Sequence, residues 1–370
     1  MRAVFSFLIT SSPVFSITLA DVVLAVGIVV LIFRILKGLK IEYPQFFTLL
    51  LLYAFSSLIS ASLSLNPYIS LPDTKELFIL FLPPIILLCE KKWLKNGLVL
   101  GVSLAAFLGI LREMVVPHQR LTGFVGHYMT EGGIMMIAFL FVAALILFEK
   151  FSLTYLFSMG VIFFALVLTL TRSAWVGTVF GIGLILYFKR KWAPLLLIPI
   201  ILIILILAPG KIRQRAVSIF SLTNPTNVER INMWKIGMRM FRDHPLFGVG
   251  QNMVSEVYPA YNKEKVPPEE LPHLHNNILQ IAVERGIISL IIFLAFISFA
   301  LLELLKIKEG DKLTPEAIGA IAVILGFFIA GLFEYNFGDS EVKFLFLSVI
   351  TIPFVKDYKK YMEGNYGKNS

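Results

Sequence analysis

Cysteine is almost absent from this chain of 370 residues, and charged residues are scarce. The one cysteine, Cys89, lies inside an apolar run, which excludes a disulfide framework and a metal site built from several cysteines. Only 15% of the residues are charged, whereas a soluble domain has about 25%. With 57% hydrophobic residues and a mean hydropathy of +0.82, this composition indicates a chain that lies largely in lipid.

Other common signals are also missing. The stretch GVGQNM at 248–253 has no third glycine and no preceding strand, which excludes a dinucleotide-binding loop. No internal repeat and no low-complexity tract occurs. Residues 3–12 are apolar but too few to span a bilayer, and no convincing signal-peptide cleavage site follows them, so we expect at most a tilted or re-entrant segment there.

Long apolar runs predict about eleven or twelve transmembrane helices. A helix needs about 20 apolar residues to cross a bilayer. The runs that we interpret as spans are 14–33, 46–65, 77–88, 97–114, 133–148, 153–170, 174–188, 193–208, 286–305, 315–333 and 342–355. The predicted fold class is therefore an all-α polytopic membrane protein.

The basic residues are distributed unevenly, which indicates the topology. Of 33 lysines and arginines, seventeen lie in loops on one side of the predicted membrane, and ten of the other sixteen lie in one long segment, 209–285. Short loops rich in Lys and Arg stay in the cytoplasm, whereas long loops are not counted. The long segment is therefore expected outside, and the net charge of +9 reflects topology rather than nucleic-acid binding.

The predicted organisation has four parts. An N-terminal membrane block of about eight spans (1–208) precedes the external segment with amphipathic helices (209–285). A C-terminal block of three spans (286–356) and a cytoplasmic tail (357–370), which we expect to be disordered at 364–370, complete the chain. Chemistry is expected on the external face.

Two external links between spans carry arginines. The glycine-rich link QRLTGFVGHYMTEGG at 119–133 contains Arg120 and His127, and the alternative is that it is only a flexible loop. In LTLTRSAWVG, Arg172 stands between two spans, where a guanidinium offers a fixed fork of donors for phosphate oxygens. The alternative for Arg172 is an interfacial anchor beside Trp175.

The long segment contains a predicted helix at 227–243. Asn227 is a candidate N-cap, and Pro245 ends the helix because the residue before a proline avoids helical dihedrals. Arg230 shares a face with aromatic residues and is expected to point inward. The opposite face carries a basic triplet, expected at solvent or lipid headgroups: Lys235, Arg239 and Arg242.

His275 stands at the predicted start of a second helix, beside Asn276. The positive end of a helix dipole disfavours imidazolium, so this histidine is expected to be neutral at pH 7 and able to accept a proton. The same helix start attracts phosphate. One alternative is a metal site with His273, for which no third ligand of suitable spacing is visible, and another is a capping or interfacial role.

A short link near the C-terminus, within 331–346, carries three acidic residues: Glu334, Asp339 and Glu341. Ionisable groups at a membrane surface are costly and indicate a function. Asp339 or Glu334 is therefore a candidate for orienting a histidine or pairing with an arginine, and the alternative is that these residues cap helices.

This ordered set of motifs resembles the O-antigen ligase family of bacterial membrane glycosyltransferases. His275 and Asn276, nine intervening residues, Gly286 and two apolar residues are similar to the family signature, with Ser289 in place of the usual last residue. The stretches TRSAWVG, MFRDHPLFGVG and FEYNFGD resemble family segments in the same order. The resemblance covers most of 119–345, and the first hundred residues match only as generic membrane helices.

The resemblance implies a membrane-embedded, GT-C-like glycosyltransferase that needs no metal or other cofactor. Its donor would be a polysaccharide on undecaprenyl diphosphate and its acceptor the lipid A-core oligosaccharide, at the periplasmic face of the cell inner membrane. The implied roles are His275 as the base, Asp339 as a supporting acid, and Arg172, Arg230 and Arg120 as diphosphate ligands. Further candidate substrate contacts are His127, Asn276 and Glu334.

Other functions stay open at this point. An O-antigen polymerase uses the same donor with a growing glycan as acceptor, and an oligosaccharyltransferase modifies protein hydroxyls. The compact external segment and the histidine signature favour a ligase over a polymerase. A lipid-linked sugar flippase would need charged residues distributed through the spans, and here Asp21 is the clearest one inside a predicted span.

Overall fold

A computed structural model describes residues 1–116, 119–149, 151–262 and 273–356. Helices dominate this part of the chain. The α-helices before the long segment are α1 (Arg2–Ser11), α2 (Ile17–Leu36), α3 (Gln45–Ser62), α4 (Pro67–Asp73), α5 (Leu82–Leu87), α6 (Lys91–Val115), α7 (Tyr128–Phe148), α8 (Leu153–Leu168), α9 (Arg172–Lys189) and α10 (Leu197–Leu207). The later ones are α11 (Gly210–Val217), α12 (Pro225–Asp243), α13 (Val254–Tyr261), α14 (Asn277–Leu304), α15 (Pro315–Ala330) and α16 (Ser340–Thr351).

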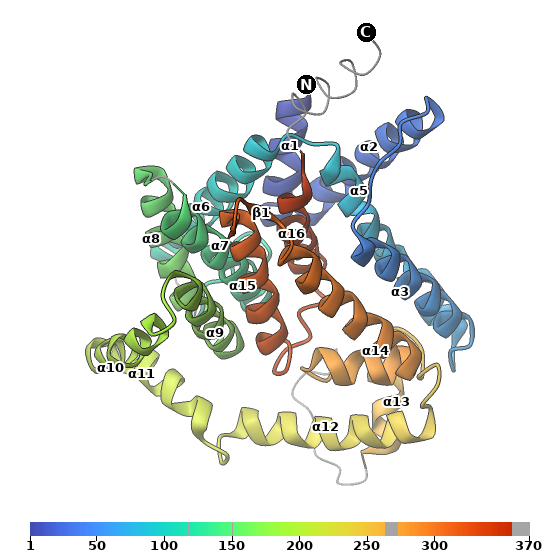
Figure 1. The fold of residues 1–370 in the computed structure, drawn as a ribbon. Coiled ribbons are helices and arrows are strands. Elements are labelled where there is room, and N and C mark those ends of the chain that lie inside the picture. Colours follow the sequence, from blue (N-terminus) through green and yellow to red (C-terminus); the bar gives the residue numbers. More distant parts are fainter. Residues whose placement is uncertain (117–118, 150, 263–272, 357–370) are drawn as a thin grey trace.

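Short elements complete the described chain. The 3-10 segments are η1 (Ser12–Val14), η2 (Thr74–Phe81), η3 (Ala193–Leu196), η4 (Ser218–Phe220) and η5 (Ile352–Phe354). Strands β1 (Lys308–Glu309) and β2 (Lys312–Leu313) form an antiparallel hairpin. Figure 1 shows the N-terminus and this hairpin at one end of a helical bundle, while α12 runs across the opposite end. The predicted tail 357–370 lies outside the described residues.

The fold class predicted from the sequence is confirmed. Each predicted span coincides with helical structure, and five described helices, α2, α3, α6, α7 and α14, are long and apolar enough to cross a membrane by themselves. Three further apolar helical segments are shorter: Leu153–Leu168, Ala193–Leu207 and Pro315–Ala330. The chain is thus an all-α polytopic membrane protein, and the number of eleven or twelve spans stays a prediction.

Two details of the N-terminal half differ from the expectation. The run 77–88 is not one helix, because η2 gives way to α5 at Leu82-Pro83-Pro84, where two residues have no backbone donor. Residues 3–12 form the short helix α1, which packs along α6. Arg2 lines a small cavity with Arg34 and Lys356.

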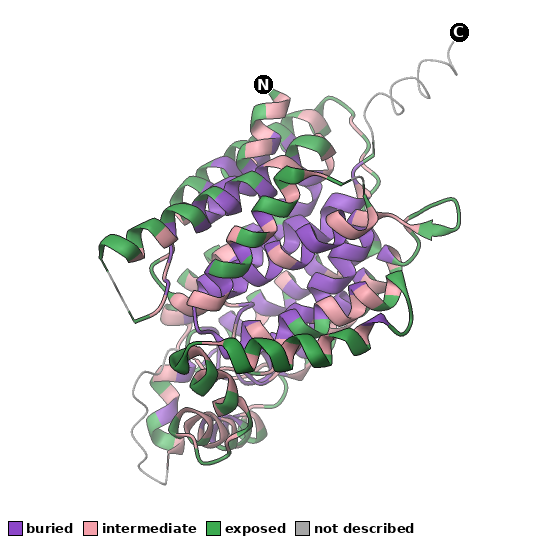
Figure 2. Ribbon diagram, turned by 90° about the vertical axis from the view of Figure 1, so that its left-hand side faces the viewer, coloured by how far each residue is buried: buried purple, intermediate pink, exposed green. Residues whose placement is uncertain are grey.

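Buried residues concentrate in the middle of the bundle, and exposed ones line its periphery (Figure 2). Helices α7, α15 and α16 are the most enclosed: most of each helix is buried. A second, smaller core lies between α12, α13 and the first turns of α14, around Met240, Val254 and Val283. This second core fixes α12 against the end of the bundle.

Helix α14 is broken at Gly286, where φ is 74° and ψ is 178°. Only glycine adopts this conformation readily. The segment 245–250 fits into the break: Ile287 N donates to Pro245 O at 2.8 Å, and Gly250 N donates to Glu284 O at 3.0 Å. The backbone groups that the break frees are therefore paired, and the helix start that carries the predicted histidine is held at a fixed angle to the rest of α14.

The helices of the bundle contain more charged residues than the sequence suggested. Lys343 in α16 is buried and pairs with Glu76 at 3.2 Å, and Lys95 in α6 pairs with Glu316 at 2.9 Å. Each of these charges has an opposite partner from another element. This arrangement joins neighbouring helices and does not line a charged path through the bundle.

Candidate functional site

The predicted base, His275, lies directly before α14 with a positive φ of 49°. Its neighbour Asn276 is the N-cap: the side-chain oxygen accepts from Leu279 N at 3.0 Å, and the side-chain amide donates to Leu332 O at 3.0 Å. Asn277 N also donates to Gly331 O at 2.7 Å. These bonds tie the start of α14 to the link between α15 and α16, which carries the predicted acids.

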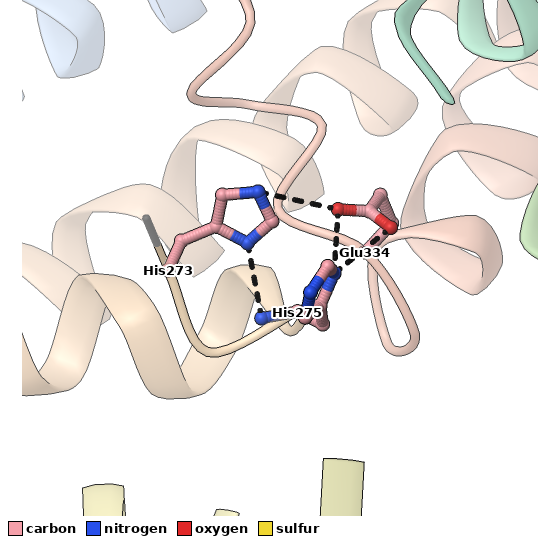
Figure 3. Close-up of side chains that lie close together, drawn as sticks. All are labelled: His273, His275 and Glu334. Atoms are coloured by element: carbon pink, nitrogen blue, oxygen red, sulfur yellow. Dashed lines mark hydrogen bonds and ion pairs between the residues drawn. The ribbon is translucent and has the colours of Figure 1, made fainter. Parts of the chain in front are cut away.

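Three side chains from these two segments converge (Figure 3). His275 Nδ1 lies 3.0 and 3.1 Å from the two carboxylate oxygens of Glu334, and His273 Nε2 lies 3.6 Å from the nearer one. The centroids of the two imidazole rings are 4.3 Å apart, and the rings meet edge to face. Glu334, one of the two acids that the sequence offers for orienting a histidine, is therefore the carboxylate that contacts His275.

The hydrogen bonds define the tautomers. His275 N donates to His273 Nδ1 at 3.3 Å, so Nδ1 of His273 carries no proton and Nε2 faces the carboxylate as the donor. In His275 the carboxylate holds the proton on Nδ1. Nε2 of His275 is consequently the nitrogen that can accept a proton from a substrate.

The charges of the cluster follow from its surroundings. Burial by itself would raise the pKa of Glu334, but the two imidazoles and Arg230 lower it to about 2. Arg230 Nη2 lies 3.2 Å from the carboxylate. Burial lowers the pKa of His273 to about 4. At neutral pH, Glu334 is therefore ionised and His273 is neutral.

Asp339 occupies a different position from the one expected of a partner of His275. It accepts a hydrogen bond from Thr130 Oγ1 at 3.1 Å, and Thr130 in turn lies 3.4 Å from His127 Nδ1. Burial, together with the negative charge of Glu334, raises the pKa of Asp339 to about 7. Asp339 and exposed His127 are thus joined through Thr130, beside the cluster of His275 and Glu334.

The predicted arginines gather near a cavity of about 260 Å³, the arginine cavity, which lies between α9, η4 and α12. Arg172 and Arg230 both line it, together with Trp234 and Phe333. The guanidinium of Arg172 donates to the carbonyl and the hydroxyl oxygen of Ser218, both at 3.1 Å. Phe333 adjoins Glu334 in the chain, and Arg230 contacts Glu334 directly. The cavity and the histidine cluster are therefore parts of one site.

Two further arginines lie close to Arg172, near enough for their charges to act on it. Arg120 stacks over the ring of Tyr128, with 4.2 Å between the guanidinium carbon and the ring centroid. Arg215 Nε donates to Leu170 O at 3.2 Å. Burial, and then the positive charge of Arg120, lower the pKa of Arg215. Such a concentration of like charges suits a bound anion.

The helix predicted at 227–243 differs at its start. It begins at Pro225 with Asn224 as N-cap, because Asn227 donates its side-chain amide to Ser218 O and Ser221 O instead. It ends at Asp243 as predicted, and Arg230 faces inward as predicted. The two carbonyls that Asn227 binds each precede a residue of the cavity wall, Ile219 or Leu222, so Asn227 positions this segment rather than capping the helix.

The histidine cluster also supplies the third metal ligand that the sequence did not reveal. Ligand atoms of His273, His275 and Glu334 lie within 4.8 Å of one another. Two imidazoles and one carboxylate are a chemically suitable donor set. However, the carboxylate is already neutralised by Arg230 at 3.2 Å, which makes the position less favourable for a cation.

Comparison with known proteins shows which family this chain resembles. The model of the O-antigen ligase family matches residues 156–294. The chain is similar to this family over that region. It is 25% identical over 333 residues to a protein of Rickettsia prowazekii, covering 82% of this chain and 77% of that protein. It is 26% identical over 288 residues to a protein of Rickettsia typhi, covering 70% of this chain and 67% of that protein. It is also 26% identical over 313 residues to a protein of Rickettsia felis, covering 77% of this chain and 74% of that protein. All three are named, provisionally, polysaccharide ligases.

The region that matches the family model contains part of the site. Arg172, Arg230 and His275 lie inside it, whereas Arg120, Glu334 and Asp339 lie outside. The carboxylate that orients the histidine is therefore contributed by a segment beyond the matched residues.

Two residues of the site were missed in the sequence. Arg215 is one of several basic residues in 209–217, and nothing in the sequence separates it from its exposed neighbours Lys211 and Arg213. His273 was weighed as a metal ligand and as a capping or interfacial residue, but not as a neighbour of the base. Its position two residues before His275 was the available signal, because an HxH pair in an irregular segment can direct both rings to one side.

Proposed function

We propose that this protein is a glycosyltransferase of lipopolysaccharide biosynthesis. It transfers a polysaccharide from undecaprenyl diphosphate to the lipid A-core oligosaccharide, at the periplasmic face of the cell inner membrane. Three observations support this proposal: the family match, the names of the relatives, and a site that lies at the opposite end of the bundle from the hairpin β1–β2, which lies in a loop that the sequence predicts to be cytoplasmic.

His275 is the base in this mechanism. Its Nε2 takes the proton of the acceptor hydroxyl while the hydroxyl oxygen attacks the anomeric carbon of the donor sugar. The new carbon–oxygen bond forms as the bond from the anomeric carbon to the diphosphate breaks, so the configuration inverts. A positioned base of this kind contributes about 10²–10⁴-fold to the rate. The ionised carboxylate of Glu334 holds the required tautomer and stabilises the imidazolium that forms.

Arg172 and Arg230 bind the diphosphate leaving group. Negative charge develops on its oxygens as the glycosidic bond breaks, and preorganised guanidinium groups stabilise that charge without a metal. The Nε of Arg230 is buried and has no hydrogen-bond partner among the described residues, so a donor is available for a phosphate oxygen. Arg120 adds positive charge to the same region.

The remaining candidates have supporting roles. Asn276 caps α14 and fixes the backbone of His275. Asp339, joined to His127 through Thr130, lies beside the cluster and is assigned to contacts with substrate hydroxyls. Glu334 is the partner of the base, a role for which the sequence offers either Asp339 or Glu334.

The observation that carries the proposal is the connection made by Arg230. This residue contacts the carboxylate that orients His275, and it also lines the arginine cavity. Arg230 thereby joins the proposed base to the proposed diphosphate ligands, and this connection supports a single displacement step.

A reconstituted reaction tests the proposal. Purified protein in lipid nanodiscs receives an undecaprenyl diphosphate-linked oligosaccharide and, in separate reactions, lipid A-core, a lipid-linked glycan or a hydroxyl-bearing protein, all with chelator present. We expect transfer to lipid A-core with inverted anomeric configuration. Extension of the glycan without transfer to lipid A-core would instead identify a polymerase, modification of the protein would identify an oligosaccharyltransferase, and retained configuration would contradict a single displacement.

A further inference from the structure

The segment 210–222, which joins the apolar helix α10 to α12, exposes large apolar side chains. Val217 is 60% exposed, Leu222 is 78% exposed and Phe220 is 86% exposed. Scattered exposed leucines are ordinary, but three large apolar groups within six residues of a short connecting segment are not. Some apolar surroundings must cover them.

The polar side of this segment faces the protein. Arg215 donates to Leu170 O, and Ser218 accepts from both Arg172 and Asn227. Ile219 and Leu222 line the arginine cavity. The segment is therefore bound to the site through its backbone and polar groups, while Val217 and Phe220 project away from it.

Two observations point to the lipid bilayer as the covering surface. The segment continues directly from α10, in which no residue is buried, and Figure 1 shows α11 following α10 at the edge of the bundle. The same segment carries exposed Lys211 and Arg213. Apolar groups combined with basic residues are the composition of a helix that lies in the interface of an anionic membrane.

We propose that 210–222 is an interfacial membrane-binding segment, with Val217 and Phe220 among the lipid chains and Arg213 at the lipid phosphates. The segment is also one wall of the arginine cavity. A lipid-linked diphosphate therefore passes laterally from the bilayer along this wall to Arg172 and Arg230. This last step rests on the proposed function, whereas the membrane contact does not.

Spin labelling in nanodiscs tests the membrane contact independently of activity. The single cysteine is buried and is replaced in a Cys89→Ser background. Labels are placed at Phe220→Cys and Val217→Cys, with Ile203→Cys in apolar α10 as the lipid reference and Glu256→Cys on α13 as the water reference. The measured quantity is the accessibility of each label to oxygen relative to a water-soluble nickel chelate.

We expect the labels at 217 and 220 to resemble the label at 203, with a high oxygen-to-nickel ratio in discs that contain phosphatidylglycerol. Ratios equal to that at 256 would overturn the membrane contact and would mean that these side chains meet water or a protein partner. The proteins' thermal midpoints, compared with that of Cys89→Ser alone, verify that the labelled chains are folded.

The lateral path is tested by transfer assays. Phe220→Asp is compared with Phe151→Asp, which alters an equally aromatic, 69% exposed side chain far from the cavity. We expect Phe220→Asp to slow transfer from the long-chain donor at least ten-fold and to slow transfer from a short-chain, water-soluble diphosphate donor much less. Equal slowing with both donors would overturn the lateral path, whereas a failure of both donors with the unaltered protein would refute the proposed function instead.

Discussion

Replacement of Glu334 by glutamine removes one charge at the centre of the site while keeping the shape of the side chain. The carboxylate lies 3.0 Å from His275 Nδ1 and is ionised at neutral pH, because its pKa is about 2. In Glu334→Gln, an amide group that donates toward Nδ1 would move the imidazole proton to Nε2. The nitrogen that accepts the substrate proton would then be blocked.

The size of the effect follows from the geometry. Two unit charges 3.0 Å apart attract by about 5 kcal/mol at an effective dielectric constant of about 20. Since about 1.4 kcal/mol corresponds to ten-fold in rate, loss of this attraction to the developing imidazolium sets an upper limit of about 10⁴-fold. In the variant, Arg230 would stand beside the imidazolium without its counter-charge, so we expect a loss of kcat of about 10²–10⁴-fold.

The assay is steady-state transfer by purified protein in nanodiscs, with kcat and KM measured for donor and acceptor. Glu334→Gln is expected to lower kcat with little change in the KM of the donor, and its thermal midpoint reports on folding. Asp339→Asn is the matched carboxylate-to-amide change, and we expect it to lower kcat less than Glu334→Gln does. A kcat for Glu334→Gln close to that of the unaltered protein, or a larger loss in Asp339→Asn, would refute the orientation of His275 by Glu334.

Three further predictions concern other parts of the molecule. Arg172→Gln is expected to lower kcat about 10²–10³-fold, because a donor to the leaving diphosphate is lost; unchanged kcat in steady-state transfer would count against it. Gly286→Ala places a Cβ against Leu246 O at a φ of 74° and is expected to lower the thermal midpoint more than Gly310→Ala, where φ is 60° and the surroundings are open; equal shifts would disprove the steric argument. Burial lowers the pKa of His273 from 6.5 to about 4. Between these pH values the unfolded chain binds a proton that the folded chain does not. The free energy of unfolding is therefore expected to decrease by up to about 3 kcal/mol as the pH falls from 6.5 to 4. His273→Gln is expected to flatten that decline in a pH series of thermal midpoints, and an unaltered decline would contradict the assignment.

The sequence predicts those features of this molecule that depend on local pattern. Apolar runs predicted the helices, and Pro245 predicted the end of α12 at Asp243. The position of His275 before a helix and the inward face of Arg230 followed from helical periodicity and capping preferences. Each of these features is decided by residues within a few positions of one another.

Features that depend on tertiary contacts could not be predicted in this way. Glu334 and Asp339 are five residues apart in one link, and the choice between them as partner of His275 depends on how Asn276 and Asn277 bind that link. The position of Arg215 close to Arg172 depends on the docking of α11 against Leu170. Such contacts join segments that are far apart in the sequence, and neither periodicity nor spacing specifies them.

Transfer by His275→Ala is the most direct measurement of the proposed chemistry. The variant and the unaltered protein are compared in nanodiscs with lipid-linked donor, lipid A-core acceptor and chelator, with donor binding measured in parallel. A base at His275 predicts a loss of at least about 10²-fold in kcat with donor binding retained. Undiminished transfer by His275→Ala would contradict it.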